Sequence, residues 1–244
     1  MVMFYLIGLG LNERSLGIEA LEVCKKADRI YLENYTARFP YNIKSMENII
    51  RREIVQLSRV HTEKADFLVN AKDKDIVLLV YGNPLTATTH TSLILECIEK
   101  KIDYKIIHNA SIFDAVAETG LQLYKFGKIA SIPKWNEKYK PGSFAVVVKE
   151  NLSIGAHTLL LVDIGLSCTD ALNQLKDALK KENLEIDYVY ICSRLGTDNK
   201  KIICIKLSDN LYEGVKQIEE PFCFVIPAKT HFIEKEFMEK LIRF

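Results

Sequence analysis

A short, almost wholly apolar run from Ile76 to Tyr81 leads into a sharp Gly-Asn-Pro turn at residues 82–84. The run is rich in β-branched and long aliphatic residues, which suit a buried strand. Behind the turn, apolar residues recur with helical spacing between positions 93 and 98. A strand, a Gly/Pro turn at its carboxyl end and a helix behind it are the parts of an open α/β sheet, which binds ligands at that end of its strands. The pattern predicts an α/β protein with a ligand site at the loop 81–91.

The same loop is rich in short hydroxyl side chains. They lie near the start of the expected helix, where backbone amides without helical partners also point: Thr86, Thr88, Thr89, Thr91 and Ser92. The loop contains no glycine repeat of the kind that cradles phosphate. This composition favours a ligand with many hydrogen-bonding edges over a ligand rich in phosphate.

The N-terminus repeats the arrangement. An apolar strand over 3–7 ends in the turn Gly8-Leu9-Gly10, a helix is expected over 15–27, and a short strand over 29–33 follows. The turn resembles part of the dinucleotide-binding pattern G-x-G-x-x-G. However, the third glycine position is occupied by Glu13, whose bulk and charge suit neither close helix packing nor a pyrophosphate. Glu33 does stand where that fold would place a ribose-binding acid. Because the third glycine is missing, an NAD-type site is the weaker alternative to a plain tight turn.

A third strand–turn–helix unit follows the central one. The strand over 104–107 ends in the polar turn 108–111, and an apolar-periodic helix comes next. The turns at 82–86 and 108–112 both follow strand carboxyl ends. We therefore expect them to face the same crevice.

The rest of the chain continues as alternating helices and strands. Helices are expected at 42–52, 62–71 (polar), 143–151, 169–181 and from 231 onward, and strands at 54–57, 129–132, 157–165, 188–192, 202–207 and 222–226. The last helix should pack through Ile233, Phe237 and Leu241. The segment 120–127 is interpreted as a linker. The loop 134–142 is interpreted as a solvated connection, with a partner-binding surface around Trp135 and Tyr139 as the alternative.

Asp163 is the one acid that ends a long apolar strand. A charge at the end of a buried strand is costly unless it has a partner. Asp163 is therefore a candidate site residue, and a turn or capping role is the alternative.

Composition excludes several classes of function. The 33 basic and 32 acidic residues leave a net charge of only +1, whereas nucleic-acid binders usually show a basic excess. The six cysteines are scattered without a C-x-x-C pair, which argues for a reducing compartment and against disulfides or zinc. No apolar run approaches the roughly 18 residues of a membrane span. We expect a soluble, cytoplasmic protein without a nucleic-acid or membrane partner.

The histidines do not form a metal site, because no pair has the spacing of metal ligands. His90, His108 and His231 lie beside turns, whereas His61 and His157 look incidental. A catalytic role for His90 competes with the simpler reading that it caps or packs the following helix.

Several segments together resemble the diphthine synthases, methyltransferases of the tetrapyrrole-methylase superfamily. The matching pieces are FYLIGLGL (4–11), RIYLENYT (29–36), GNPLTATTH (82–90), HNASI (108–112), GLQLYKFG (120–127) and HTLLLVDI (157–164). HNASI and GLQLYKFG are similar to the eukaryotic branch. Beyond residue 170 the resemblance rests on CSRLG (192–196) and PFCFVIP (221–227), and the chain is short for that branch.

The resemblance implies two α/β domains, 1–112 and 113–244, a homodimer, no metal, and S-adenosylmethionine (SAM) bound in the cleft between the domains. Carried over by motif, the cofactor contacts are Leu11, Asn83, Thr86, Ser111, Ile112, Asp163, Leu195 and Phe222. The family usually has aspartate where Asn83 stands, which removes a carboxylate from the site. It often has histidine where Phe222 stands, so that contact becomes apolar.

The substrate that the resemblance implies is the 3-amino-3-carboxypropyl-histidine of translation elongation factor 2. The acceptor amine must be unprotonated, so a carboxylate or water could remove its proton, and Asp163 is the only strand-end acid available for this. No catalytic residue is otherwise assigned, and methylation of the carboxylate is left open. Two alternatives remain: an enzyme of the same fold acting on a tetrapyrrole precursor or ribosomal RNA, and a non-catalytic SAM-binding protein. The near-neutral charge disfavours RNA, and GLQLYKFG disfavours a tetrapyrrole.

Overall fold

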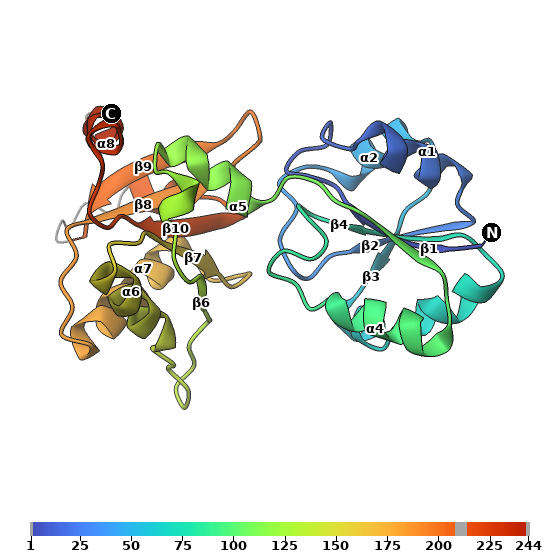
Figure 1. Ribbon diagram of the computed structural model, residues 1–244, viewed down its shortest axis with the longest axis horizontal. Coiled ribbons are helices and arrows are strands. Elements are labelled where there is room, and N and C mark those ends of the chain that lie inside the picture. The colour runs from blue at the N-terminus through green and yellow to red at the C-terminus, as the bar shows by residue number, and fades with distance from the viewer. Residues whose placement is uncertain (1, 208–213, 243–244) are drawn as a thin grey trace. The chain divides into compact units, whose positions relative to one another are not determined.

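The computed structural model describes residues 2–207 and 214–242. The chain divides into two compact units, 1–113 and 114–244, and the division falls one residue after the expected end of the first domain. Each unit is built on its own five-stranded sheet flanked by helices (Figure 1). The predicted α/β class is confirmed.

The first unit contains a fully parallel sheet in the order β3-β2-β4-β1-β5. Its strands are β1 (Phe4–Gly8), β2 (Arg29–Glu33), β3 (Val55–Leu57), β4 (Ile76–Val80) and β5 (Tyr104–Ile107). All five residues of the central strand β4 are buried, because side chains alternate between two faces and both faces are covered. The continuous apolar run predicted this burial correctly.

Helices cover the two faces of this sheet. On one face lie α1 (Ile18–Lys26) and α2 (Ile43–Ile50); on the other lie α4 (Thr91–Lys100) and the 3-10 helix η1 (Asp66–Lys72), which follows the short α3 (Arg59–Glu63). Val77 and Leu79 pack toward α1 and α2, whereas Leu78 and Val80 pack toward η1 and α4.

The neighbouring strands β1 and β4 are followed by helices on opposite faces. The chain leaves β1 through α1 on one face and leaves β4 through α4 on the other. Such a reversal opens a crevice beyond the carboxyl ends of the two strands, where doubly wound sheets bind ligands. Connectivity alone therefore places the candidate site of this unit beyond Gly8 and Val80.

Two helix expectations in the first unit are wrong. The polar helix at 62–71 is broken by Ala65, whose φ of 53° is left-handed, and its second half buries Phe67 and Leu68. The first helix begins at Ile18 and not at Ser15, because Gly17 is extended and acts as its N-cap residue.

The second unit contains a mixed sheet in the order β6-β7-β10-β8-β9. Only β6 and β7 pair in parallel; the other described pairs are antiparallel. The strands are β6 (Ala130–Ile132), β7 (Thr158–Val162), β8 (Tyr188–Ser193), β9 (Lys201–Lys206) and β10 (Phe222–Ile226).

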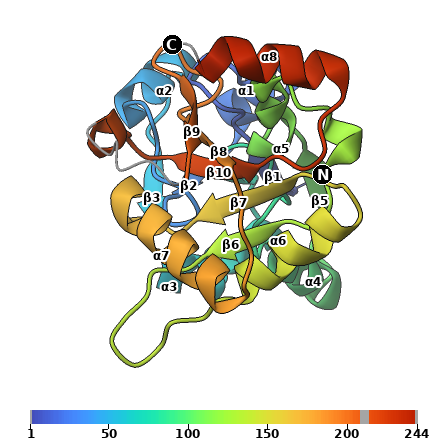
Figure 2. The same ribbon diagram turned by 90° about the vertical axis from the view of Figure 1, so that its left-hand side faces the viewer.

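The helices of this unit also lie on both faces of the sheet. Figure 2 shows α8 (Phe232–Ile242) on the side opposite α6 (Ser143–Ser153) and α7 (Cys168–Lys181). The shorter elements are α5 (Ile112–Ala115), which crosses the division between the units, and the 3-10 helices η2 (Val116–Thr119), η3 (Leu123–Lys125) and η4 (Gly214–Gln217). The main core lies between the sheet and α6 and α7, as the apolar spacing of α7 predicts.

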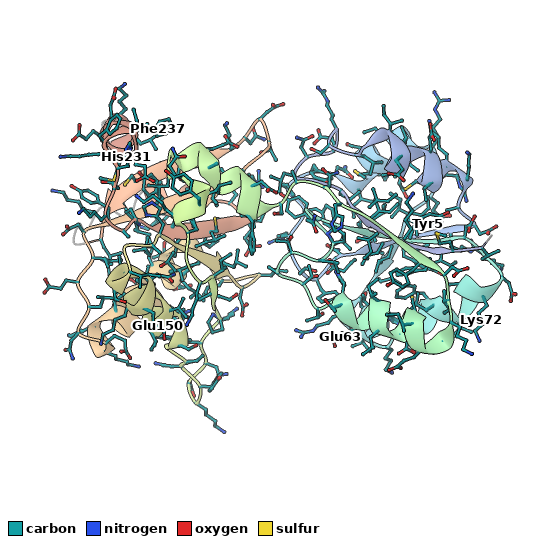
Figure 3. The ribbon with its side chains drawn as sticks, viewed as in Figure 1. Tyr5, Glu63, Lys72, Glu150, His231 and Phe237 are labelled. Carbon is teal, nitrogen blue, oxygen red and sulfur yellow. The ribbon has the colours of Figure 1, made fainter. Side chains whose placement is uncertain are left out.

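Three expectations in this unit are corrected. In α8, Ile233 is 46% exposed and Phe237 (Figure 3) is 42% exposed. Among the side chains of this helix that the structure describes, the fully buried one is Glu234. The segment 120–127 is not a linker, because it lies inside the second unit and includes η3. In the loop 134–142, Tyr139 is exposed as expected for a solvated connection. Trp135 is half-buried against the core, however, and its indole N–H donates to Pro141 O at 2.9 Å.

Among the described helices, none combines the length and the hydrophobicity that a membrane-spanning helix needs.

Candidate functional site

Three strand-end corners of the first unit are tied together by hydrogen bonds. The first follows β1 at residues 8–11, the second follows β4 at 82–86, and the third follows β5 at 108–112. Gly10 N donates to Gly82 O at 3.1 Å, and Gly82 N donates to Gly10 O at 2.9 Å. Because these two bonds close a small bridge beyond the ends of β1 and β4, the first two corners form one structure.

The glycines of the first corner allow the chain to pack closely. A Cβ on Gly8 would lie 2.6 Å from Gly82 O, and one on Gly10 would lie 2.5 Å from Ser15 Cβ. Gly10 also has a φ of +70°, which favours glycine. Both glycines therefore serve contacts within the protein, which supports the plain-turn reading over a pyrophosphate-binding reading.

Glu33, the acid of the NAD-type alternative, is committed to its own loop. Its Oε1 atom accepts hydrogen bonds from Tyr35 N at 2.6 Å and Thr36 N at 2.5 Å, and the residue is buried. The carboxylate closes the turn after β2, and this role accounts for its position without a ribose.

Asn109 joins the third corner to the first. Its side-chain Nδ2 donates to Gly8 O at 3.1 Å and to Ser15 O at 2.9 Å. Its own backbone oxygen accepts a bond from Asn83 Nδ2 at 3.0 Å, which links it to the second corner. Asn109 was not selected from the sequence. The available signal was its position in a polar turn directly after a strand, where asparagine commonly bonds to backbone.

The central loop GNPLTATTH is held in shape by its own side chains. Pro84 O accepts bonds from Thr88 Oγ1 at 2.8 Å and His90 Nδ1 at 3.0 Å. Asn83 Oδ1 accepts from Leu85 N at 3.1 Å, and Ala87 adopts a left-handed φ of 54°. These contacts fix the backbone of the loop, so the Thr86 side chain is presented from a preformed turn. Within the described residues the Thr86 hydroxyl has no partner.

His90 is buried, with one ring nitrogen engaged and the other not. The carbonyl of Pro84 can only accept, so Nδ1 must carry the proton that joins them. Nε2 is buried without a partner in the described residues. The structure thus gives His90 the role of holding the loop, as the packing interpretation predicts. The unpartnered Nε2 has no further explanation.

The five sequence-predicted residues of the first unit lie on these three corners. Leu11 and Ser111 are buried, and Asn83, Thr86 and Ile112 are half-buried. Tyr81 Oη donates to Leu11 O at 3.3 Å, which connects the end of β4 with the first corner. The three corners beyond the carboxyl ends of β1 and β4 therefore carry apolar side chains and a few polar groups. That mixture suits an adenosyl ligand better than a polyphosphate.

The three predicted residues of the second unit lie at the same end of its sheet. Phe222 begins β10 and pairs with Ser193 at the end of β8, while Asp163 follows the end of β7. Because β10 is antiparallel to both neighbours, its start lies beside their carboxyl ends. Leu195 follows β8, so all three residues lie where β7 and β8 end and β10 begins.

Asp163 is not the buried charge that its sequence position suggested. The residue is exposed, and its Oδ2 accepts a bond from Lys134 N at 3.0 Å. Exposure removes the desolvation argument for a site role. Its capping bond agrees with the turn alternative, and a ligand contact stays a prediction.

The turn that carries Leu195 is anchored by Arg194. This residue has a left-handed φ of 50°, its backbone N donates to Pro221 O at 2.8 Å, and its guanidinium pairs with Glu219. Leu195 and Phe222 are 2% and 8% exposed, so both apolar side chains at this end of the sheet are packed.

The second unit also contains a buried ionic cluster that was not predicted from the sequence. Glu234 Oε1 accepts from His157 Nε2 at 3.1 Å and from Gln122 N at 2.9 Å; Oε2 accepts from Lys125 and from His231 N at 2.6 Å. His157 Nδ1 accepts from Ala228 N at 2.9 Å, so the ring is neutral with its proton on Nε2. His157, interpreted as incidental, is fully buried.

The pKa values of this cluster agree with a fixed ion pair. Burial raises the pKa of the Glu234 carboxyl, but hydrogen bonds from Lys125, Gln122 and His231 outweigh burial and lower it to about 2. Burial lowers the pKa of His157, which the bond to Glu234 only partly opposes. Because both oxygens of Glu234 and both ring nitrogens of His157 are engaged, the cluster is structural and ties α8 to the segment 120–127.

Comparison with known proteins gives this architecture a family. The family model described as Tetrapyrrole (Corrin/Porphyrin) Methylases matches residues 3–209. A diphthine methyl ester synthase of Emericella nidulans is 46% identical over 165 residues, which cover 66% of this chain and 58% of that protein. A diphthine synthase of Methanocaldococcus jannaschii is 37% identical over 256 residues, 98% of each chain.

A solved structure agrees along the whole chain. The crystal structure of an Entamoeba histolytica protein, provisionally named a diphthine synthase, superposes with a TM-score of 0.89 at 30% identity and covers 99% of each chain. The match to the fungal relative spans little more than half of that protein's length. The resemblance to diphthine synthases found in the sequence is confirmed, and the chain belongs to the tetrapyrrole methylase family.

Proposed function

We propose that this chain is a SAM-dependent methyltransferase of the diphthine synthase type. The observation that carries the proposal is the convergence of the corners 8–11, 82–86 and 108–112 beyond β1 and β4, in a chain of the tetrapyrrole methylase family. The carboxyl ends of β1 and β4 are where such a sheet binds its ligand.

The residues of the first unit fit the cofactor. Leu11 and Ile112 offer apolar surface for an adenosyl group, and the unengaged Thr86 hydroxyl offers a hydrogen bond to its polar edges. Asn83 and Ser111 complete the proposed contacts there, and Asp163, Leu195 and Phe222 would contribute from the second unit. No Lys or Arg occurs in the three corners, in keeping with a ligand without phosphate.

When bound, SAM supplies a methyl group already activated by its positive sulfur, so the protein mainly has to align the acceptor with it. The acceptor amine must be neutral to react. Asp163 is exposed at its strand end and could take a proton from water or from the amine. No buried acid of the described residues is left unpaired for this task, since Glu33 and Glu234 are both committed.

For the acceptor we propose the 3-amino-3-carboxypropyl-histidine of translation elongation factor 2, which places the protein in the cytoplasm, where that factor works. The relatives named above support this choice. We further propose a homodimer. Light scattering after size exclusion should give twice the monomer mass of 27.9 kDa, and a monomer at micromolar concentration would refute the dimer.

The function is tested by binding and then by transfer. Calorimetry should detect S-adenosylhomocysteine (SAH), and labelled methyl from SAM should appear on elongation factor 2 that carries the unmethylated residue. Asp163→Asn should transfer the methyl group more slowly than the wild type. Transfer only to a tetrapyrrole or to ribosomal RNA would identify one of the alternative enzymes, and binding without any transfer would identify a SAM-binding protein.

The same assay decides whether the carboxylate is methylated. Methyl esters are cleaved by mild alkali, whereas N-methyl groups are stable. Alkali-labile label would show that the chain forms the ester, as the name of the fungal relative says of that protein.

A further inference from the structure

We propose that His108 binds the carboxylate of an amino-acid group on the ligand, with its ring held in the donor form by Asn83. The proposal rests on the proposed function, since it places the ligand at the three corners. It assigns a binding residue that the sequence did not select.

The amide of Asn83 is held in one orientation. Its Oδ1 accepts from Leu85 N at 3.1 Å, so the other amide atom must be the nitrogen. Nδ2 has two hydrogens. One is donated to Asn109 O at 3.0 Å and the other to His108 Nδ1 at 3.2 Å. The bonds to Leu85 N and Asn109 O fix this orientation, because a flipped amide would lose both of them.

This orientation of the Asn83 amide determines the tautomer of the neutral His108 ring. Because Asn83 Nδ2 only donates, His108 Nδ1 must accept and cannot carry the proton. The proton of the neutral ring is therefore on Nε2. His90, fixed by the carbonyl of Pro84, has the opposite form with its proton on Nδ1. Of the two, only His108 offers an N–H to a ligand.

His108 is also the polar residue of its turn that remains available. It is exposed, and within the described residues its Nε2 has no partner. The side chain of Asn109 is turned inward to Gly8 O and Ser15 O, and Ser111 Oγ accepts from Phe113 N. Among the described residues, the third corner therefore presents the His108 Nε2–H as a side-chain donor without a partner, next to the proposed cofactor contacts Asn83 and Ser111.

The chemistry of the reactants identifies the group that this donor would meet. The methyl donor and the proposed acceptor both end in an amino-acid group, and hydrogen bonds to a carboxylate are stronger than those between neutral groups. The corners 8–11, 82–86 and 108–112 contain no Lys or Arg, so an imidazole N–H is the strongest side-chain donor there for an anion. The carboxylate belongs either to the methionine part of SAM or to the acceptor residue.

Two substitutions of His108 distinguish a ligand-binding role of its ring from a structural role. In His108→Asn, the side-chain oxygen can still accept from Asn83, but no donor reaches the place of Nε2. In His108→Gln, the longer amide places an N–H near Nε2, but the bond to Asn83 is weakened. A binding role predicts that Gln is the better replacement, whereas a structural role predicts that Asn is.

Titration calorimetry with SAH and with 5′-methylthioadenosine, which lacks the amino-acid group, identifies the source. If SAM supplies the carboxylate, His108→Asn should weaken SAH about tenfold and His108→Gln less than about threefold, while methylthioadenosine should bind all three proteins equally. If the acceptor supplies the carboxylate, SAH binding should be unchanged in both variants. KM for elongation factor 2 should then rise about tenfold in His108→Asn and less than about threefold in His108→Gln.

Three results would overturn the proposal: unchanged SAH affinity and KM in both variants, an equal loss of methylthioadenosine binding, or Asn as the better replacement. Nitrogen-15 NMR of neutral His108 must also show the proton on Nε2, and a proton on Nδ1 would refute the role of Asn83. A wild-type protein that does not bind SAH at all would refute the proposed function itself.

Discussion

Two polar clusters, one in each unit, differ in how completely they are hydrogen-bonded. In the second unit, Glu234 and His157 are fully buried and every hydrogen-bonding atom of the pair is satisfied within the chain. In the first unit, the corners are fixed by backbone, asparagine and Pro84 contacts, but the Thr86 hydroxyl and His108 Nε2 are left without partners among the described residues. We infer from this difference that Glu234 and His157 hold the fold, whereas Thr86 and His108 are available to bind a ligand.

Glu234→Ala should give the largest effect. The change leaves the Lys125 ammonium, the His157 N–H and the N–H groups of Gln122 and His231 without their acceptor. Removing one partner of a buried ion pair costs about 3–5 kcal/mol, and we expect the unfolding free energy in urea to fall by that amount. Glu234→Gln, which keeps one acceptor oxygen, should lose less. A loss below about 1 kcal/mol in the alanine variant would contradict the structural role.

Acid should weaken the same cluster. The pKa of Glu234 is about 2 in the folded protein against 4.5 for a free side chain, so its stabilisation is complete above pH 4.5 and is lost as the pH falls toward 2. Burial lowers the pKa of His157 below 6.5, so protonation of this ring also favours the unfolded chain as the pH falls. The stability difference between wild type and Glu234→Gln should shrink between pH 5 and pH 3. A constant difference over that range would count against the ion pair.

Gly8→Ala should have an intermediate effect and test the close packing of the first two corners. Its Cβ would lie 2.6 Å from Gly82 O and 2.9 Å from Pro84 Cδ, so the backbone of both corners must move. We expect a loss of about 1–3 kcal/mol in stability and a weaker affinity for SAH. Gly17→Ala is the matched control, because nothing lies within 4 Å of its Cβ. Equal effects in the two variants would show that close packing is not the cause.

Thr86→Val should have the smallest effect on stability and sharpens the comparison most. Because the Thr86 hydroxyl has no partner within the described residues, its removal should change the unfolding free energy by less than about 0.5 kcal/mol. SAH affinity should nevertheless fall several-fold in calorimetry. A stability loss with unchanged affinity would place Thr86 among the structural groups.

The sequence predicted the parts of the fold that follow from local pattern. The apolar run of β4 and the spacing of α7 gave both elements nearly to the residue, because burial on both faces and burial on one face leave different signatures. The break at Ala65 was not predictable in this way. Ala65 is left-handed and is buried in the same cluster as Phe67 and Leu68, and no Gly, Asn or Pro in the sequence marks the break.

The sequence predicted the strand-end corners but not the hydrogen bonds that connect them. The strand-end corners were found because Gly, Asn and Pro turns punctuate the chain. The role of Asn109 depends on Gly8 and Ser15, which lie far away in the sequence, and Glu234 meets Gln122 in the same long-range manner. A glutamate on an otherwise apolar helix face gives no local sign of burial. Asp163, in contrast, follows an apolar strand but turns out to be exposed.

A crystal structure of the complex with SAH tests the central claim most directly. We expect the ligand to lie beyond β1 and β4, in contact with Leu11, Thr86 and Ser111 from all three corners. A ligand bound along the turn Gly8-Leu9-Gly10 alone, or at a place that none of the three corners reaches, would contradict it.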